Sequence, residues 1–279
     1  MAFVKVSTVL QIADRANTAA IGFNCVDYNT IYSVITAAEE LNKPVICMLY
    51  PEHAYRCNVI SLAGFAAIVR DLAEKVSVPV GVHLDHSSDY DYIMEAIRCG
   101  FNSVMYDGSM LPLEENIANT RKVVEAAARF GAEVEAELGH VGFASHADQD
   151  KADLYTQPEV AARFVRETNV NSLAVAIGSA HGFYTKTPKL DLERLDKINS
   201  ATDVHLVMHG GSGIPQDQVD QAFRLGINKF NVGTEFLKLY KDSTFKHAGD
   251  QSLLPEDVAA RVQADLIAYL REKLLLTKV

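Results

Sequence analysis

The chain of 279 residues is long enough for two small domains, but single α/β barrels also reach this size, and we expect one domain over residues 1–279. Its hydrophobic share of 48% and charged share of 22% are ordinary for a folded protein and argue against an extended disordered region. The net charge of −10 argues against nucleic acid as the main partner, because binding a phosphate backbone requires clustered Lys and Arg. A local anion site stays open.

The first residues, Met1–Ser7, lack the basic start and long apolar stretch of a signal peptide. No apolar run reaches the roughly 18 residues of a membrane-spanning helix, so we expect a cytoplasmic protein with no membrane partner. The four cysteines show no CxxC spacing, which predicts reduced thiols. Cys25 and Cys47 fall near predicted strand ends, and we expect buried apolar packing for both.

Eight short β-rich runs are spaced regularly along the chain. Most are near-continuous apolar runs, which is typical of strands buried on both faces of a parallel sheet. In chain order the predicted strands are Ala20–Cys25, Pro44–Leu49, Pro79–Leu84, Ser103–Tyr106, Glu133–Leu138, Ser172–Ile177, Val204–Met208 and Lys229–Val232.

Stretches with helical periodicity lie between these strands. They cover Tyr28–Leu41, Leu62–Lys75, Tyr90–Arg98, Glu115–Phe130, Gln157–Arg166, Leu192–Ile198 and Gln216–Leu225. Gly100, Gly131 and Gly226 each follow a helical run directly, in the position where a left-handed C-terminal cap needs glycine.

The regular alternation of strands with helices predicts an α/β fold, a (βα)8 TIM barrel. No G-x-G-x-x-G follows the first strand, which argues against an open doubly wound sheet with a dinucleotide site. The amphipathic segment Asp257–Leu274 predicts an extra C-terminal helix that packs outside the barrel or against a neighbouring subunit. The segment Gly139–Tyr155 predicts a mobile loop on the face where barrel enzymes keep their chemistry.

Polar residues that can bind a metal ion or a substrate lie at the carboxyl ends of several predicted strands. They are Asp85, His86, Asp107, Glu137, His181, His209 and Asn231. Because a barrel brings these ends to one rim, the three histidines and the carboxylates predict a Zn2+ site in which three ligands leave an open position. We expect His83 to be a core residue or to contact a metal ligand without binding the metal itself. His53, His205 and His247 receive no functional role.

Two glycine-rich segments follow the last two predicted strands. They are His209-Gly210-Gly211-Ser212-Gly213 and Asn231-Val232-Gly233-Thr234-Glu235. Glycines let the backbone approach an anion closely, and exposed N–H groups with a hydroxyl from Ser212 or Thr234 can donate to its oxygens. Tight turns chosen only for geometry would account for one such segment more easily than for two. The pair therefore predicts a phosphate site.

Several motifs occur together and are highly specific as a set. They are His83-Leu84-Asp85-His86, Val104-Met105-Tyr106-Asp107-Gly108-Ser109, Val134-Glu135-Ala136-Glu137-Leu138-Gly139, Ala176-Ile177-Gly178-Ser179-Ala180-His181-Gly182 and the two glycine-rich segments. Along most of its length the chain resembles the class II, zinc-dependent fructose-bisphosphate and tagatose-bisphosphate aldolases.

The resemblance implies a role for each matching residue. Zinc would be bound by His86, His181 and His209, with Asp107 and Glu137 able to hold a second or displaced metal position, and Asp85 would be the proton donor. The C1-phosphate end of the substrate would be held by Gly182, Gly210, Gly211, Ser212, Asn231, Val232, Gly233 and Thr234. In the family a monovalent cation, Na+ or K+, often assists there. Zinc would act as a Lewis acid on the enediolate left by ketose cleavage, and a homodimer or homotetramer is implied.

Three segments depart from the family pattern. After the second strand the chain reads Cys47-Met48-Leu49-Tyr50-Pro51-Glu52, where a small hydroxyl residue with glycine nearby is usual. Leu254-Pro255-Glu256-Asp257 replaces an Asp-Pro-Arg whose arginine reaches the second phosphate, and Arg261 could substitute only if its helix shifted. The loop from His140 to Asp148 lacks the glutamate that moves the C3 proton, leaving Asp148 or His146 as candidates.

These departures concern the substrate end far from the C1 phosphate or the loop. They predict a ketose 1-phosphate whose C6 end is not an ordinary phosphate, for example 6-deoxy-6-sulfofructose 1-phosphate. Cleavage would give dihydroxyacetone phosphate and an aldehyde. The alternative is a fructose- or tagatose-1,6-bisphosphate aldolase proper.

Other classes also stay open. A metal-dependent barrel hydrolase could use the same three-histidine site, although such enzymes commonly carry His-x-His after the first strand, where this chain has Phe23-Asn24-Cys25. A non-catalytic aldolase partner subunit would fit the altered segments, but the retained metal ligands and Asp85 argue against it. A lysine-dependent aldolase is disfavoured because Lys229 lies early in the last strand.

Overall fold

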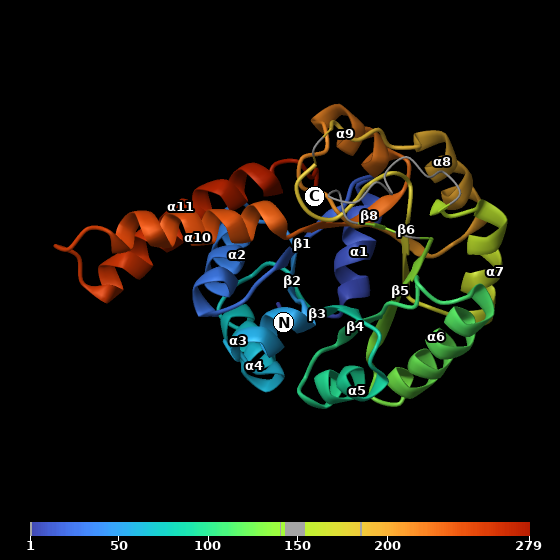
Figure 1. Cartoon of the computed structure of the whole chain (residues 1–279), viewed down its shortest axis with the longest axis horizontal. Coiled ribbons are helices and arrows are strands. Elements are labelled where there is room, and N and C mark those ends of the chain that lie inside the picture. Colours follow the sequence, from blue (N-terminus) through green and yellow to red (C-terminus); the bar gives the residue numbers. More distant parts are fainter. Residues whose placement is uncertain (1, 140, 143–153, 185) are drawn as a thin grey trace.

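A computed structural model describes residues 2–139, 141–142, 154–184 and 186–279, with the side chains of 55–57 outside the description. Eight parallel strands follow one another in chain order around a closed barrel, and helices surround it (Figure 1). The strand β1 (Ala20–Asn24) pairs with β2 (Val45–Leu49) on one side and β8 (Ile227–Val232) on the other, which closes the barrel. The predicted (βα)8 barrel is confirmed.

The remaining strands agree with the predicted ranges to within a few residues. They are β3 (Val80–Ser87), β4 (Ser103–Tyr106), β5 (Glu133–Leu138), β6 (Ser172–Val175) and β7 (His205–Met208). The largest difference is at the end of β3, which contains Asp85 and His86 instead of ending before them. Pairing between β3 and β4 shifts between Leu84 and Ser87, and His86 has a φ of 41°. A bulge of this kind re-aims side chains without ending the strand, and hydrophobic periodicity does not reveal it.

The helices include three that the sequence did not predict. In chain order they are α1 (Val6–Arg15), α2 (Tyr28–Glu40), α3 (Pro51–Cys57), α4 (Leu62–Ala73), α5 (Tyr90–Arg98), α6 (Leu113–Ala128), α7 (Pro158–Thr168), α8 (Leu192–Ala201), α9 (Gln216–Arg224), α10 (Thr234–Ala248) and α11 (Pro255–Leu274). The unpredicted ones are α1, α3 and α10. Pro51 at the first position of α3 is a helix-start signal, because proline lacks only an N–H that has no partner there.

The expected glycine caps and buried thiols are present. Gly100, Gly131 and Gly226 have φ values of 106°, 69° and 106° just after α5, α6 and α9. Cys25 and Cys47 are fully buried and carry free thiols. Within the described residues, none of the helices combines the length and apolarity needed to cross a membrane.

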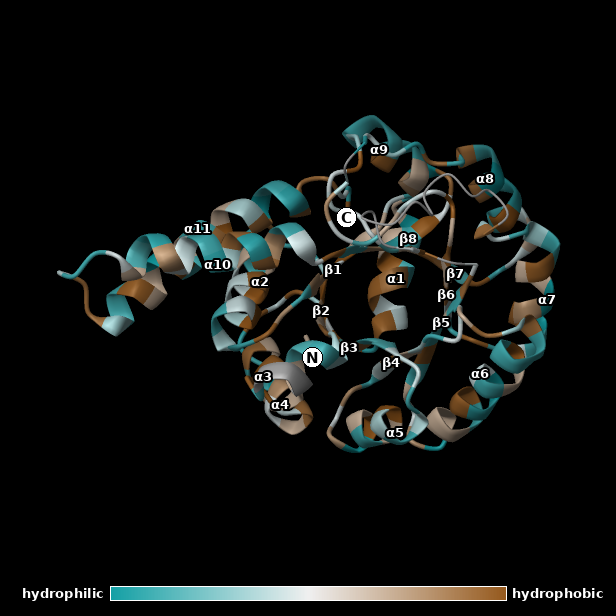
Figure 2. Ribbon diagram, viewed as in Figure 1, coloured by the Kyte–Doolittle hydropathy of each residue, from teal (hydrophilic) through white to brown (hydrophobic). Residues whose placement is uncertain are grey.

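The strands separate two apolar cores. Ile21 and Phe23 of β1 belong to the large core between the barrel and its ring of helices, whose surfaces alternate hydrophobic and hydrophilic residues (Figure 2). Ala20, the first residue of the same strand, instead packs inside the barrel with Ile46 and Met48. This alternation follows from the period of two in a strand.

Helix α1 closes the amino end of the barrel. Its buried residues Val6, Val9, Leu10 and Ala13 form the inner core with the inward side chains of β1 and β2. Figure 1 shows α1 lying across the barrel axis. The inner apolar core therefore sits at one end of the barrel, opposite the end where the strands terminate.

Helices α10 and α11 form an antiparallel pair that extends to one side of the barrel (Figure 1). Helix α11 packs against α2 and α10, so the predicted extra C-terminal helix is confirmed and lies outside the barrel. Phe245 and Leu254, near the connection between the two helices, are 71% and 59% exposed. We call the helix pair α10 and α11 the arm.

Substituting Leu10 with alanine tests the role of the α1 plug. Leu10 is 1% exposed, so Leu10→Ala should lower the free energy of unfolding by roughly 2–5 kcal/mol through lost burial and a residual cavity. Urea denaturation measures the change, and Gln11→Ala, at an exposed position of the same helix, is the matched control. Equal stabilities for the two variants would show that α1 does not seal the barrel.

Candidate functional site

A cavity of about 700 Å³ opens at the carboxyl ends of the strands. Its wall contains most of the predicted site residues, namely Asp85, His86, Asp107, Glu137, His181, Gly182, Gly210, Gly211, Ser212, Asn231, Gly233 and Thr234. His209 is fully buried and contacts His86 from behind. Val232 was also predicted to bind substrate, but its side chain packs in the outer core and does not line the cavity. It points away because it neighbours the inward Asn231 on β8.

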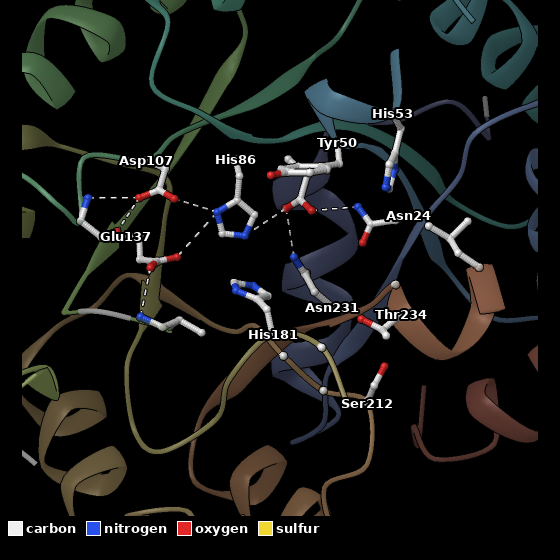
Figure 3. Close-up of a pocket in the computed structure, with 18 of the residues that line it drawn as sticks. Asn24, Tyr50, His53, His86, Asp107, Glu137, His181, Ser212, Asn231 and Thr234 are labelled. Carbon is white, nitrogen blue, oxygen red and sulfur yellow. Dashed lines mark hydrogen bonds and ion pairs between the residues drawn. The ribbon is translucent and has the colours of Figure 1, made fainter. Parts of the chain in front are cut away.

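Three imidazoles from β3, the segment after β6 and the segment after β7 converge at the centre of the site. Figure 3 shows two of them, His86 and His181, side by side. The ring centroids of His86 and His209 are 4.5 Å apart, and those of His86 and His181 are 4.9 Å apart. One nitrogen from each of His86, His181 and His209 lies within 4.8 Å of the others. Such a set of imidazole nitrogens suits zinc, with room for a further ligand.

Carboxylates orient two of these imidazoles in opposite ways. The Nδ1 of His86 is 2.9 Å from Asp107 Oδ2, which directs Nε2 of that ring into the cluster. The Nε2 of His209 is 2.9 Å from Glu135 Oε1, which directs Nδ1 into the cluster. The two inward nitrogens are 2.7 Å apart. Both rings therefore aim a nitrogen at the same point, as metal ligands do.

A second group of possible ligands consists of His86, Asp107 and Glu137. Glu137 Oε1 accepts a hydrogen bond of 3.3 Å from the backbone N–H of Val141. Its Oε2 is buried without a hydrogen-bond partner in the described part of the chain and lies 3.9 Å from His86 Nδ1. An unsatisfied buried carboxylate oxygen beside an imidazole fits a cation in this second position.

The protein groups alone perturb one another strongly. Burial would lower the pKa of His86, but the charge of Asp85 and the hydrogen bond to Asp107 outweigh it and raise that pKa to about 9. Burial lowers the pKa of His181 to about 4. Burial, with Asp107 nearby, raises the pKa of Glu137 to about 8. Strong shifts in a cavity are typical of functional sites.

Asp85 is held as a carboxylate at the edge of the cluster. Asn24 donates to its Oδ2 at 2.8 Å, and Asn231 donates to its Oδ1 at 3.2 Å. Burial opposes ionisation, but the charge of His86 and the hydrogen bond from Asn24 help to lower the pKa of Asp85 to about 2. Figure 3 shows both amides directed at this carboxylate from β1 and β8. Asp85 can therefore accept a proton without rearranging.

The glycine-rich segments form the other side of the cavity, where Ser212 and Thr234 lie in Figure 3. Gly211 is required because a Cβ there would lie 2.3 Å from the Phe230 ring. Thr234 begins α10, whose capping position, Gly233, offers no side-chain hydrogen bond to the helix. The N-terminus of a 15-residue helix thus lies at the cavity wall, which favours an anion there.

Several lining residues were not predicted. They are Asn24, Tyr50, His53, Ser109, Met110, Val141 and Leu237. His53, to which the sequence assigned no role, enters the wall through α3, with its ring centroid 5.2 Å from that of Tyr50. Tyr50 in turn contacts the His86 ring at 6.2 Å between centroids. The proline at the start of α3 was the available signal, since it would have placed His53 on a helix and Tyr50 just before it.

Other predicted positions lie elsewhere. His83 is fully buried beneath the cluster, with Nδ1 2.8 Å from Ser103 Oγ. Arg261 is on the arm and does not line the cavity. It lies near Asp250, whose pKa is lowered mainly by hydrogen bonds from Ser252 and to a smaller extent by the charge of Arg261. Of the predicted mobile loop, residues 140 and 143–153 are outside the described residues, and so are the candidates His146 and Asp148.

Comparisons with known proteins point to one enzyme family. A family model described as fructose-bisphosphate aldolase class-II matches residues 4–277. The D-tagatose-1,6-bisphosphate aldolase subunit GatY of Klebsiella oxytoca is 40% identical over 252 residues, covering 88% of this chain and 86% of that protein. The crystal structure of the YdjI aldolase from Escherichia coli K12 superposes with a TM-score of 0.88 at 32% identity, covering 99% of this chain and 97% of that one.

A more distant structure supports the fold alone. The fructose-bisphosphate aldolase of Campylobacter jejuni superposes with a TM-score of 0.80 at 22% identity, covering 99% of this chain and 95% of that one.

Removing one imidazole tests the metal-binding capacity of the cluster. We expect the metal-depleted protein to bind zinc, and His181→Ala to weaken that binding by more than about 100-fold, because losing a ligand exceeds the 10- to 100-fold cost of losing an outer contact. Competition with a fluorescent chelator measures the affinity. His53→Ala, in the same wall but outside both ligand groups, should leave the affinity unchanged. An unaltered affinity in His181→Ala would exclude this cluster.

Proposed function

Because the chain belongs to the class II fructose-bisphosphate aldolase family, we propose that it catalyses the reversible aldol cleavage of a ketose 1-phosphate to dihydroxyacetone phosphate and an aldehyde. The observation that carries the proposal is one cavity holding the imidazole cluster, an ionised Asp85 and a glycine-rich anion site. The family also makes the chain an aldehyde-lyase, as predicted, which leaves the hydrolase reading without support.

In this proposal His86, His181 and His209 hold a zinc ion, and Asp107 and Glu137 provide the second position. When bound, zinc supplies a Lewis acid beside the substrate carbonyl oxygen. The donor types and the orphaned Glu137 oxygen support this assignment. A monovalent cation, Na+ or K+, at the phosphate end stays a prediction.

Asp85 handles the proton of the C4 hydroxyl. In the cleavage direction its carboxylate accepts that proton as the C3–C4 bond breaks, and in the synthetic direction it returns the proton to the forming hydroxyl. Amide donors from Asn24 and Asn231 hold both oxygens, so the carboxylate is already oriented. Ionisation at neutral pH suits the accepting role.

The C1 phosphate is placed at the glycine-rich side. Backbone N–H groups around Gly211 and at the start of α10, with the hydroxyls of Ser212 and Thr234, match the charge and the oxygens of that group. Tyr184 supports the wall by donating to Gly210 O at 2.9 Å and accepting from Ala180 N at 2.7 Å. Gly182 and Asn231 complete the proposed contacts.

For the remainder of the substrate we propose tagatose 1,6-bisphosphate first and fructose 1,6-bisphosphate next. The name of the relative that is 40% identical favours this alternative over a 6-substituted ketose 1-phosphate such as 6-deoxy-6-sulfofructose 1-phosphate. One observation keeps the 6-substituted sugar as a second candidate: among the described lining residues there is no Lys or Arg to bind a second phosphate.

The lysine-dependent mechanism has no support in the barrel. Lys229 is fully buried and its Nζ contacts both oxygens of Glu135, at 3.1 and 2.8 Å, so it is not presented to a substrate carbonyl. For the assembly, we propose a homodimer or homotetramer that uses the arm, where Phe245 and Leu254 are exposed. A cytoplasmic location and a phosphorylated sugar as the small-molecule partner complete the proposal.

Replacing the proposed proton carrier should abolish most of the chemistry. Asp85→Asn is expected to lower kcat by about 10²- to 10⁴-fold, because an amide cannot accept the proton. Enzyme-coupled detection of dihydroxyacetone phosphate measures the rate, and zinc content is determined on the same samples. Asp91→Asn, at an exposed position of α5, is the control. Activity within threefold of the unmodified protein, or activity that survives thorough chelation, would contradict the mechanism.

A panel of sugar phosphates decides between the two substrate candidates. We expect kcat/KM for tagatose 1,6-bisphosphate to exceed that for 6-substituted ketose 1-phosphates by at least about tenfold, which corresponds to about 1.4 kcal/mol. The opposite order would reject the bisphosphate and support the second candidate. No cleavage of any member by zinc-loaded protein would reject the proposed function and favour a non-catalytic partner subunit.

A further inference from the structure

A buried ion pair crosses the barrel beneath the cavity, between β5 and β8. Lys229 Nζ is 2.8 Å from Glu135 Oε2, and both side chains are fully buried. These strands are not neighbours in the barrel, so the contact runs through its interior. Neither residue lines the cavity, and the proposed reaction uses neither of them.

Stability alone does not account for such a pair. Desolvating two charges costs about as much as their attraction returns, and apolar side chains of similar size would fill the barrel as well. The pair therefore needs another reason to be there. Its contact with a proposed metal ligand supplies one.

Glu135 Oε1 lies 2.9 Å from Nε2 of His209. An ionised carboxylate can only accept a hydrogen bond, so the imidazole proton must sit on Nε2. The lone pair is then on Nδ1, the nitrogen that lies 2.7 Å from His86 Nε2 inside the cluster. The opposite tautomer would turn an N–H toward the metal and leave Glu135 facing a lone pair.

The other neighbours of Glu135 leave Oε1 directed at His209. Ser172 Oγ donates to Oε2 at 3.4 Å, and His83 Nε2 is 3.8 Å from the same oxygen. Lys229 contacts both oxygens and supplies the compensating charge. The amide of Asn231 also approaches His209 Nε2, at 3.5 Å, but its shorter contact is to Asp85 at 3.2 Å.

We infer that Glu135, anchored by Lys229, is a positioning residue that fixes the tautomer of His209 so that Nδ1 faces the metal site. The inference rests on the metal-binding role of His209 in the proposed function. Asp107 does the same for His86 through the other ring nitrogen, at 2.9 Å. A carboxylate behind a metal-binding histidine commonly sets its orientation and basicity.

Two double variants separate the acceptor from the ion pair. Glu135→Leu with Lys229→Met removes the charges and the acceptor together while keeping the volume, so no ion is left unpaired. Glu135→Gln with Lys229→Met removes the charges but keeps a carbonyl acceptor for His209. Zinc affinity is measured by chelator competition, and urea denaturation verifies that each variant is folded.

The His209 tautomer is read directly in metal-free protein labelled with ¹⁵N-histidine, with its signals assigned by their loss in His209→Asn. In the unmodified protein the proton should be on Nε2. In the leucine variant it should distribute over both nitrogens, and zinc should bind roughly 10- to 100-fold more weakly. The glutamine variant should stay within about threefold of the unmodified affinity.

Equal zinc affinities for the leucine variant and the unmodified protein would overturn the inference, and so would equal losses in both double variants. Should the leucine variant not fold, a proton on Nδ1 in the unmodified protein is the outcome that rejects it. If the unmodified protein binds no zinc, the proposed function fails, and the tautomer of His209 still tests the positioning role separately.

Discussion

Closing eight strands into a barrel leaves every second side chain facing the axis, where its only surroundings are the other inward side chains. At the amino end α1 fills this space with apolar residues such as Val9 and Leu10. At mid-height the space holds a paired lysine and glutamate, and at the carboxyl end it holds imidazoles and carboxylates. The interior thus becomes more polar toward the cavity. The reactive groups therefore lie on buried charged side chains and not directly on the apolar core.

The same enclosure fixes the orientation of the imidazoles. A ring in water could rotate and exchange its proton between the two nitrogens, but His209 lies between Glu135 and His86 with no exposed surface. Asp107 holds His86 in the same way, but through Nδ1 instead of Nε2. Preorganised donors of this kind need no rearrangement when charge develops in a reaction.

The sequence predicted the barrel, its helical ring and most of the cavity wall, because strand ends of a barrel must meet on one rim and His86, His181 and His209 are at such ends. It did not predict the bulge in β3, since pairing resumes at Ser87 after His86 and the hydrophobic pattern is undisturbed. The family resemblance also implied a substrate contact for Val232, and strand alternation directs its side chain into the outer core, away from Asn231.

The sequence also contained a signal for the inward positions of Glu135 and Lys229, but their charged side chains concealed it. Glu133-Val134-Glu135-Ala136-Glu137 alternates strictly, and that pattern places Glu135 on the same face as Glu137. Lys229 and Asn231 are likewise two residues apart on β8. What no pattern in one chain reveals is that β5 and β8 present these two opposite charges at the same height, because that depends on the stagger of the closed barrel.

The ion pair at the centre of the barrel also restricts how this chain can diverge. Replacing Glu135 or Lys229 alone leaves an unpaired charge in a closed interior. The free energy of unfolding then falls by roughly 3–5 kcal/mol, which is a large share of the stability of an ordinary domain. Descendants can therefore abandon the pair only through two coordinated replacements, a rare event in a lineage that changes one residue at a time. Drift is freer at the cavity mouth, where Met110 is 77% exposed, so new substrate preferences can arise there while the interior stays as inherited.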